Sequence, residues 1–484
     1  MDATGEGAGD GSRARPLRSL AEALARRGAA TVRLLPGRYA GPFVLPPEVR
    51  LEGQGEGVVL HAETPDRPVL EVGGDVLVSG VVVEGGEWGL EVAGGAQVHL
   101  ARVGFRGQHT GAVRVEAGRL EVEDCRFEAA PAAAAGVLLE GGQARQEREP
   151  AAPGGSAAPP EAPGASDGDR LPLAVAEARI RTSVFTGPYR RAVRARGTGS
   201  LAVVEKTRFT GPATAVSVDG AHAEVRDATA EGGQAAGFSV MEGTLILEDV
   251  EVTGHEYGVS AMQARRLDVR RFTSTRAARA GMGLSLSRAL LRDIEVRDSG
   301  AYGGLQFVGG DLDVERIRLE GTAEYGLMAL RGKLRLRDAT ISRVSTSDGV
   351  AGDGLHLRQL EADVEGVVVH GAQGACVLAA QNARVSLRDA DLEACGYVGM
   401  LTDTLARMSA SHVSVRGAAT ALGALGDGEL RVDGLTAREL VQGLVHAECG
   451  GATQVHVQDL RSDDTRGLSA PCVQRGSQRP ASPP

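Results

Sequence analysis

The sequence predicts an all-β solenoid, in which the chain winds into many similar coils around one core. A register of about 22 residues recurs, and each repeat opens with a small residue followed by apolar, any and apolar residues. Examples are 237–240 (Gly-Phe-Ser-Val) and 354–357 (Gly-Leu-His-Leu). Because the apolar residues are spaced by two, the repeats consist of strands and not of helices. The fixed Asn or Cys position of leucine-rich repeats is missing.

The composition indicates which residues form the core and which classes of partner are not expected. Hydrophobic residues make up 42% of the chain but aromatic residues only 3%, which predicts a core of Val, Leu, Ile and Ala. The net charge of −10 is spread without a basic block, so no nucleic-acid partner is expected. A run of about 18 apolar residues is absent, so no membrane span is expected. We also expect no secretory signal in this chain, because its first residues lack an apolar stretch.

A short helix is predicted at the start of the fold, over 17–28. Ser19 and Glu22 form a capping-box pattern there, and Gly28 follows the last turn. The apolar face of this helix consists of Leu20, Ala23 and Leu24. A stack of coils needs its open end covered, and the helix is expected to do this. Strand-like pieces then complete the N-terminal part, 17–60, at 31–35, 49–51 and 58–60.

The entry strands carry a family resemblance. Residues 35–39 (Leu-Pro-Gly-Arg-Tyr), followed by 49–55 (Val-Arg-Leu-Glu-Gly-Gln-Gly), resemble the entry segment of the pectin-lyase-like superfamily, and the later repeats resemble its coil. The resemblance implies a right-handed parallel β-helix of about 16 coils over 61–472, with a short N-terminal capping helix. It alone favours an extracytoplasmic location, and the compartment is otherwise unassigned.

Four segments depart from the repeat. Residues 1–16 and 473–484 are expected to be disordered termini. Residues 141–170 are dominated by Gly, Ala, Pro, Ser and Glu and are expected to form a disordered insertion loop. The coil that opens at Gly326 is longer than the others by about six residues, over 345–353.

No catalytic or metal-binding residue is predicted. The enzymes of the resembled superfamily carry clustered aspartates with Gly-His-Gly and Arg-x-Lys, or calcium-binding acids with an outward Arg, and none of these motifs stands in register here. We therefore predict a non-catalytic scaffold or binding protein without a cofactor. The alternative is a polysaccharide lyase, hydrolase or epimerase that acts on uronate-type polymers. A structural protein that stacks end to end is disfavoured by the capping helix and the Pro-rich C-terminus.

Two sets of carboxylates could be mistaken for catalytic groups. Asp311 and Asp313 point outward about 7 Å apart, a separation that glycosidases can use. The register, however, places them in rows of alternating charge, Arg288-Asp311-Lys333-Glu361-Arg384 and Asp313-Arg335-Asp363. Carboxylates flanked by cations stay ionised, which opposes a general-acid role, and the rows are expected to penalise a slipped register. Recurrent aspartates at a bend are expected to adopt left-handed geometry, at Asp227, Asp249, Asp293, Asp338 and Asp389.

A candidate ligand site lies where the repeat breaks. Aromatic residues stand just before or near an opening glycine at Trp88, Tyr257, Tyr302, Tyr325 and Tyr397. Corner packing explains most of them, but beside the lengthened loop they meet polar residues on a regular scaffold. The candidate ligand-binding residues are Tyr302, Tyr325, Asp348, Asp353 and His356. His255 and Glu256 are expected to be a surface pair.

Apolar residues at the outward position of the opening strand predict a covered surface. They are Met328, Leu378, Leu401 and Val445. A polysaccharide or a protein partner could cover them, and so could the chain's own tail, 474–484, or the disordered insertion loop. The five cysteines contain no C-x-x-C pair and are too scattered for a disulfide framework or a zinc site. Only Cys449 and Cys472, about one repeat apart, are a possible disulfide.

Overall fold

The computed structural model describes residues 9–26, 31–142, 175–346, 349 and 351–476. It confirms the predicted fold, an all-β right-handed parallel β-helix, with about 17 turns. Of the predicted insertion loop, 141–170, only residues 141–142 are described. Gly28, Asp348 and residues 477–484 also lie outside the described residues. The chain forms two compact units, residues 1–204 with 218–223, and residues 205–217 with 224–484.

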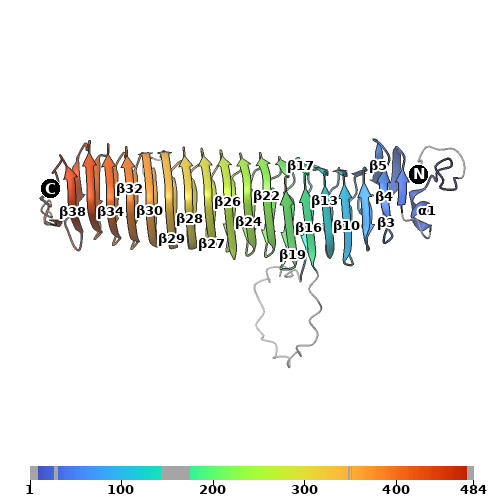
Figure 1. Ribbon diagram of the computed structural model, residues 1–484, viewed down its shortest axis with the longest axis horizontal. Coiled ribbons are helices and arrows are strands. Elements are labelled where there is room, and N and C mark those ends of the chain that lie inside the picture. The colour runs from blue at the N-terminus through green and yellow to red at the C-terminus, as the bar shows by residue number, and fades with distance from the viewer. Residues whose placement is uncertain (1–8, 27–30, 143–174, 347–348, 350, 477–484) are drawn as a thin grey trace, which may run out of the picture. The chain divides into compact units, whose positions relative to one another are not determined.

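The first unit contains the only helix of the described residues and a series of short parallel strands (Figure 1). Its elements are α1 (Leu20–Ala25), β1 (Thr31–Leu34), β2 (Gly37–Gly41), β3 (Phe43–Leu45), β4 (Arg50–Gly53), β5 (Val58–Ala62), β6 (Leu70–Val72), β7 (Val76–Ser79), β8 (Val82–Glu84), β9 (Trp88–Val92), β10 (Ala96–Ala101), β11 (Gly104–Arg106), β12 (Gly111–Val115), β13 (Gly118–Glu123), β14 (Arg126–Glu128), β15 (Ala135–Glu140), β16 (Ala176–Arg181), β17 (Val184–Thr186), β18 (Arg191–Arg196) and β19 (Ser200–Glu205).

The second unit has longer strands, several of which continue through the bends of a coil. They are β20 (Arg208–Thr210), β23 (Ala236–Met241), β24 (Thr244–Thr253), β25 (Tyr257–Met262), β26 (Arg266–Thr275), β27 (Ala280–Arg297), β28 (Leu305–Glu320), β29 (Tyr325–Val344), β30 (Asp353–Ala372), β31 (Ala375–Ala380), β32 (Arg384–Glu393), β33 (Val398–Asp403), β34 (Arg407–Arg416), β35 (Thr420–Ala424), β36 (Glu429–Arg438), β37 (Gly443–Ala447), β38 (Gln454–Ser462) and β39 (Val473–Arg475). Strands β21 (Val216–Asp219) and β22 (His222–Glu231) have residues in both units, and the last residue of β19, Glu205, belongs to the second.

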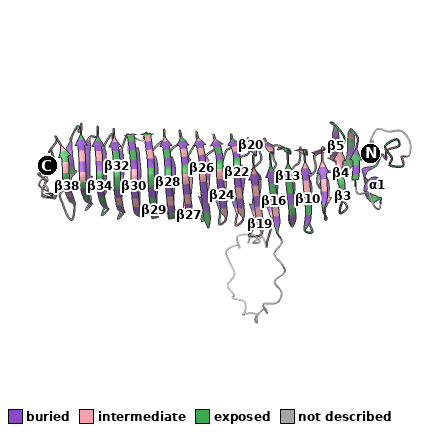
Figure 2. Cartoon of the chain, in the orientation of Figure 1, coloured by how far each residue is buried: buried purple, intermediate pink, exposed green. Residues whose placement is uncertain are grey.

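Parallel pairing extends on both sides of the predicted range 61–472. In the first unit it already joins β1 to β4, and in the second it reaches β39, which pairs with β38. Along the strands buried and exposed residues alternate, so one face of each strand lines the core (Figure 2). Because β39 pairs with β38, the start of the predicted disordered tail 473–484 is a strand as far as Arg475.

The helix α1 is shorter than predicted but is capped at the expected residue. The Ser19 hydroxyl accepts a hydrogen bond from the Glu22 backbone N–H at 3.3 Å. The Glu22 carboxylate pairs with Arg26 at 3.3 Å, so only half of the predicted capping box forms. The three predicted apolar residues are buried, and the helix packs against β3.

Phenylalanines add to the aliphatic core that the composition predicts. In the first unit Phe105, Phe127 and Phe185 stack from coil to coil with nearly parallel rings, at centroid distances of 5.2 and 4.3 Å. Seven phenylalanines rank among the largest fully buried side chains of the described residues. Few aromatic residues are present, but those few are concentrated inside, where they contribute large buried surfaces.

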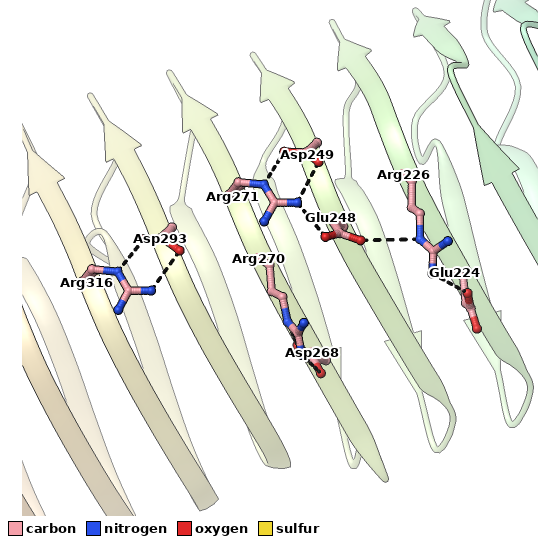
Figure 3. A network of polar contacts seen from close by, with 9 residues as sticks. All are labelled: Glu224, Arg226, Glu248, Asp249, Asp268, Arg270, Arg271, Asp293 and Arg316. Carbon is pink, nitrogen blue, oxygen red and sulfur yellow. Dashed lines mark hydrogen bonds and ion pairs between the residues drawn. The ribbon is translucent and has the colours of Figure 1, made fainter.

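The bend after the middle strand of each coil confirms the predicted left-handed geometry in the second unit. All five predicted aspartates have φ between +51° and +56°. Arg271 and Arg316 occupy the same bend with φ of +49° and +57°. Each forms two hydrogen bonds to the aspartate of the preceding coil, Arg271 to Asp249 at 2.5 and 2.8 Å, and Arg316 to Asp293 at 2.6 and 3.0 Å (Figure 3). These guanidinium groups hold the pKa of both carboxyls below its usual range.

His255 is a buried core residue, and the expectation of a surface pair with Glu256 is wrong. It exposes 1% of its surface, and neither ring nitrogen has a hydrogen-bond partner in good geometry. It follows Gly254, whose φ of +70° turns the next side chain inward. Desolvation lowers the pKa of His255 below its ordinary value, and backbone groups near Ala235 and Ala213 offset this only in part.

His255 is expected to make stability depend on pH. The folded protein keeps the imidazole neutral, whereas the unfolded chain takes up a proton once the pH falls below about 6.5. The free energy of unfolding therefore decreases as the pH falls from about 6.5 toward the lower folded-state pKa, by at most about 1.4 kcal/mol per pH unit. Denaturation midpoints of wild type and His255→Gln from pH 5 to 8 measure this. Glutamine is a suitable replacement because Gln108 is buried after a similar glycine bend. Parallel pH profiles of the two proteins would contradict the assignment.

Candidate functional site

The outward row of the opening strands follows the predicted register except at its last member. Lateral pairing aligns Gln306 with Met328, Met328 with His356, His356 with Leu378, and Leu378 with Leu401. Gly423 then aligns with His446, whereas Val445 aligns with Leu422 in the core. The prediction treats Gly443 as the opening residue of its coil. Gly443 pairs instead with Thr420, the residue before the opening residue Ala421, so the prediction that Val445 faces outward is wrong. A slip of one residue reverses the face of every side chain in a strand.

The structure brings together three of the five predicted ligand-binding residues. The carboxylate of Asp353, at the start of β30, contacts His356 Nδ1 at 2.6 Å. Its other oxygen accepts a hydrogen bond from the Ala375 N–H at 2.8 Å. The ring of Tyr325 meets the imidazole edge-on, with 4.8 Å between centroids. Two fixed partners thus hold the carboxylate, and the carboxylate orients the imidazole.

The remaining two predicted residues do not complete this cluster. Tyr302 lies before β28, is 42% exposed, and carries the Arg279 guanidinium 5.9 Å from its ring centroid. Asp348 lies outside the described residues. The His356 side chain is only 5% exposed, so the cluster is closed although its strand position faces outward. It is a buried polar contact within β30 that also joins this strand to Tyr325 on the preceding coil and to Ala375 on the following one.

The outward apolar stripe is largely covered by its own members. Leu401 is 8% exposed and packs with Ala375, Val398 and the half-buried Leu378. A Cβ atom added to Gly423 would lie 2.7 Å from Leu401 Cδ1, so Leu401 lies over this glycine. Met328 is half-buried. The stripe is a small cluster on the second unit and offers little free apolar area.

Two disulfides join four of the five cysteines. The predicted pair Cys449–Cys472 has an S–S distance of 1.97 Å, and Cys376–Cys395 has one of 2.07 Å. The sequence does not predict the second pair, and with it the sequence argument against disulfides fails. Cys376 is the opening residue of its coil, since Val377 after it pairs with Leu355, and Cys395 follows Ala394, which has φ of +54°. Both thiols thus point into one coil, and only a coil-by-coil model of the bends would show this.

A broad concavity, the ladder groove, lies elsewhere, on the outer face of the strands from β26 to β36. This ladder groove has a volume of about 1310 Å³. Its acidic lining residues are Asp311, Asp313, Glu361, Asp363 and Glu429. They are outnumbered by basic ones, among them Arg266, Arg288, Lys333, Arg335, Arg384 and Arg407. None of the described residues that line it is aromatic.

The predicted charge rows form the floor of this groove. Lateral pairing confirms the order Arg288-Asp311-Lys333-Glu361-Arg384 and the order Asp313-Arg335-Asp363. Ion pairs form in only part of the rows, between Arg288 and Asp311 at 3.9 Å and between Arg335 and Asp313 at 3.3 Å. Among the described residues no ion pair includes Lys333, Glu361 or Arg384, although the three are neighbours in the row.

Neither a metal centre nor a membrane-spanning helix is found in the described part of the chain. No group of three or more His, Cys, Asp or Glu side chains there could hold a metal ion. No described helix is long and apolar enough to cross a membrane.

Comparison with known proteins returns solved structures only. No family model and no curated protein matches. The mannuronan C-5 epimerase AlgE6 A-module of Azotobacter vinelandii is 12% identical, covers 91% of this chain and 93% of its own, and has a TM-score of 0.19. The catalytic unit of a GH87 α-1,3-glucanase from Streptomyces thermodiastaticus is 11% identical, covers 99% of this chain and 69% of its own, and has a TM-score of 0.24. A point mutant of the periplasmic alginate epimerase AlgG is 10% identical over 80% and 77%, with a TM-score of 0.22.

These values assign no role to any residue of this chain. The architecture itself is that of a parallel β-helix repeat protein, consistent with the pectin-lyase-like superfamily that the entry segment resembles. Function has to be argued from the groove and its charges.

The Asp353–His356 contact is expected to be structural. Asp353→Ala would leave a buried imidazole and the Ala375 N–H without their partner, at a cost of about 3 kcal/mol. Asp433→Ala is the matched control, because Asp433 is exposed on β36 and belongs to no ion pair of the described residues. This control should change stability by about 0.5 kcal/mol or less. Chemical denaturation followed by circular dichroism measures both, and equal midpoints would refute a structural role.

Proposed function

We propose that the protein is a non-catalytic binding scaffold for an extended, charged polysaccharide of the uronate type, held along the ladder groove. The single observation that carries the proposal is the groove itself, which crosses the coils from β26 to β36 on one face of the second unit. Stacked parallel strands repeat every 4.8 Å or so, and a surface with a regular repeat suits a ligand with a regular repeat.

The chemistry of the lining supports a charged ligand over a neutral one. Neutral sugars are commonly bound by stacking on aromatic rings, and the described lining has none. It has instead an excess of basic side chains, of which Lys333 and Arg384 belong to no ion pair of the described residues. Cations without a protein partner lose less by binding an anion than cations that must first leave an ion pair.

The same lining supports binding without catalysis. Hydrolysis of a glycoside requires one carboxyl group that stays protonated and donates its proton. In the groove Asp313 contacts Arg335 at 3.3 Å, and Asp363 contacts Arg388 at 3.1 Å. Both carboxylates are thus already engaged by guanidinium groups, which occupy the oxygens that would have to face a glycosidic bond. The competing function, a lyase, hydrolase or epimerase acting on uronate polymers, would need a proton donor and a base placed on the two sides of one sugar ring, and the in-register rows of alternating charge do not single out such a pair.

The two lysines of the chain provide a matched test. Lys333 lies in the groove, whereas Lys206 is exposed outside its lining. Lys333→Gln is expected to weaken binding of a polyuronate about fivefold, which corresponds to about 1 kcal/mol for one exposed charge contact. Lys206→Gln should bind like wild type. Titration calorimetry at low salt measures both, and the difference should shrink as ionic strength rises.

Two outcomes would overturn the proposal. If wild type binds a neutral glucan as tightly as a polyuronate, the charges of the groove do not select the ligand. If ultraviolet absorbance of an unsaturated product rises when the protein is mixed with a polyuronate, the protein is a lyase and not a scaffold.

A further inference from the structure

We propose that Arg384, Arg407, Ser386 and Ser409 form an anion subsite within the ladder groove, which takes a carboxylate or a sulfate ester of the bound polymer. This inference rests on the function proposed above. It adds the position and the chemistry of the main anchor.

The alternation of charge breaks at this position. Arg384 pairs in register with Arg407 on the next strand. Two cations thus stand side by side on strands separated by about 4.8 Å. Like charges directly opposite each other destabilise a sheet, and the preceding row avoids them by alternating sign. The fold alone gives no reason for this pair.

The nearby acids compensate the two arginines only in part, because Glu361 pairs in register with Arg384 but forms no ion pair with it. Arg384 belongs to no ion pair of the described residues. Arg407 contacts Glu429 at 3.5 Å, but Glu429 also contacts Arg431 at 2.6 Å. One carboxylate is therefore shared by two guanidinium groups, while the third has none.

The neighbouring row supplies hydroxyl groups where acids stood before. Ser386 follows Asp363 in register, and Ser409 follows Ser386. Asp363 itself is engaged by Arg388 at 3.1 Å. The two arginines and the two serines together offer guanidinium N–H groups and hydroxyls as hydrogen-bond donors. Such a set of donors suits an anion with several acceptor oxygens.

A second pair of arginines in the same groove shows the opposite situation. Arg266 contacts the buried Asp268 at 2.9 Å, and Arg288 contacts Asp311 at 3.9 Å. Each of these cations contacts a carboxylate, although Asp268 also contacts Arg270 at 3.2 Å. Adjacent arginines therefore do not by themselves leave an open site, and what distinguishes the Arg384–Arg407 end of the groove is that Arg384 belongs to no ion pair of the described residues.

The test compares two double variants of the full chain that remove the same charge from the same groove. Arg384→Gln/Arg407→Gln is expected to weaken polyuronate binding about thirtyfold, because two charge-assisted contacts are lost. Arg288→Gln/Arg335→Gln removes arginines that already have carboxylate partners and should cost about threefold or less. Circular dichroism and denaturation midpoints verify that both variants are folded.

Competition and a second polymer identify the anion. Sodium sulfate should displace the polymer from wild type more strongly than sodium chloride at equal ionic strength, and this difference should vanish in Arg384→Gln/Arg407→Gln. Parallel titrations with a polyuronate and with a sulfated neutral glucan distinguish a carboxylate from a sulfate ester by which polymer loses more affinity in that variant.

The results separate the two proposals. Equal losses in the two double variants, with binding by wild type intact, would overturn the subsite and leave the groove. Absence of polymer binding by wild type would overturn the proposed function and the subsite together.

Discussion

The lateral, in-register pairing of parallel coils is the constraint on which the rest of the structure depends. Because each residue lies beside its counterpart one coil away, any property of one position becomes a row along the stack. Inward rows become the core, bends become lines of left-handed residues, and outward rows become lines of charge. Arg271 illustrates this, since it occupies a bend that normally suits Asp and is held there by two hydrogen bonds to Asp249 one coil before.

Features that repeat every two residues or once per coil could be predicted from the sequence, whereas features determined by the backbone geometry of the bends could not. Alternation and the entry segment sufficed for the β-helix, and coil-by-coil alignment sufficed for the row from Arg288 to Arg384. Positive φ at a bend breaks the alternation, which is why the sequence misplaces His255 and does not predict the Cys376–Cys395 pair. The error at Val445 has a related cause, because the glycine before it resembles an opening residue without occupying that position.

In the candidate site, an outward position in the repeat does not make a side chain accessible to solvent. His356 lies on the outward row as predicted, yet its side chain is closed because Tyr325 and Asp353 lie against it. Whether an outward side chain is covered depends on the lengths of its neighbours on adjacent coils, and no repeat pattern encodes that. The groove is visible in the sequence only as its charges, since a concavity depends on how neighbouring strands and side chains pack.

The alternating bends impose a parity rule on how such a chain can grow or shorten. Along the bend row the order is Asp249, Arg271, Asp293, Arg316 and Asp338, and each arginine contacts the aspartate of the preceding coil. Deleting the single coil that carries Arg271 would bring Asp249 beside Asp293, whereas deleting two coils would bring Asp249 beside Arg316. Between Asp249 and Asp338, removing one coil would therefore place two carboxylates side by side, whereas removing two coils would preserve the alternation of charge.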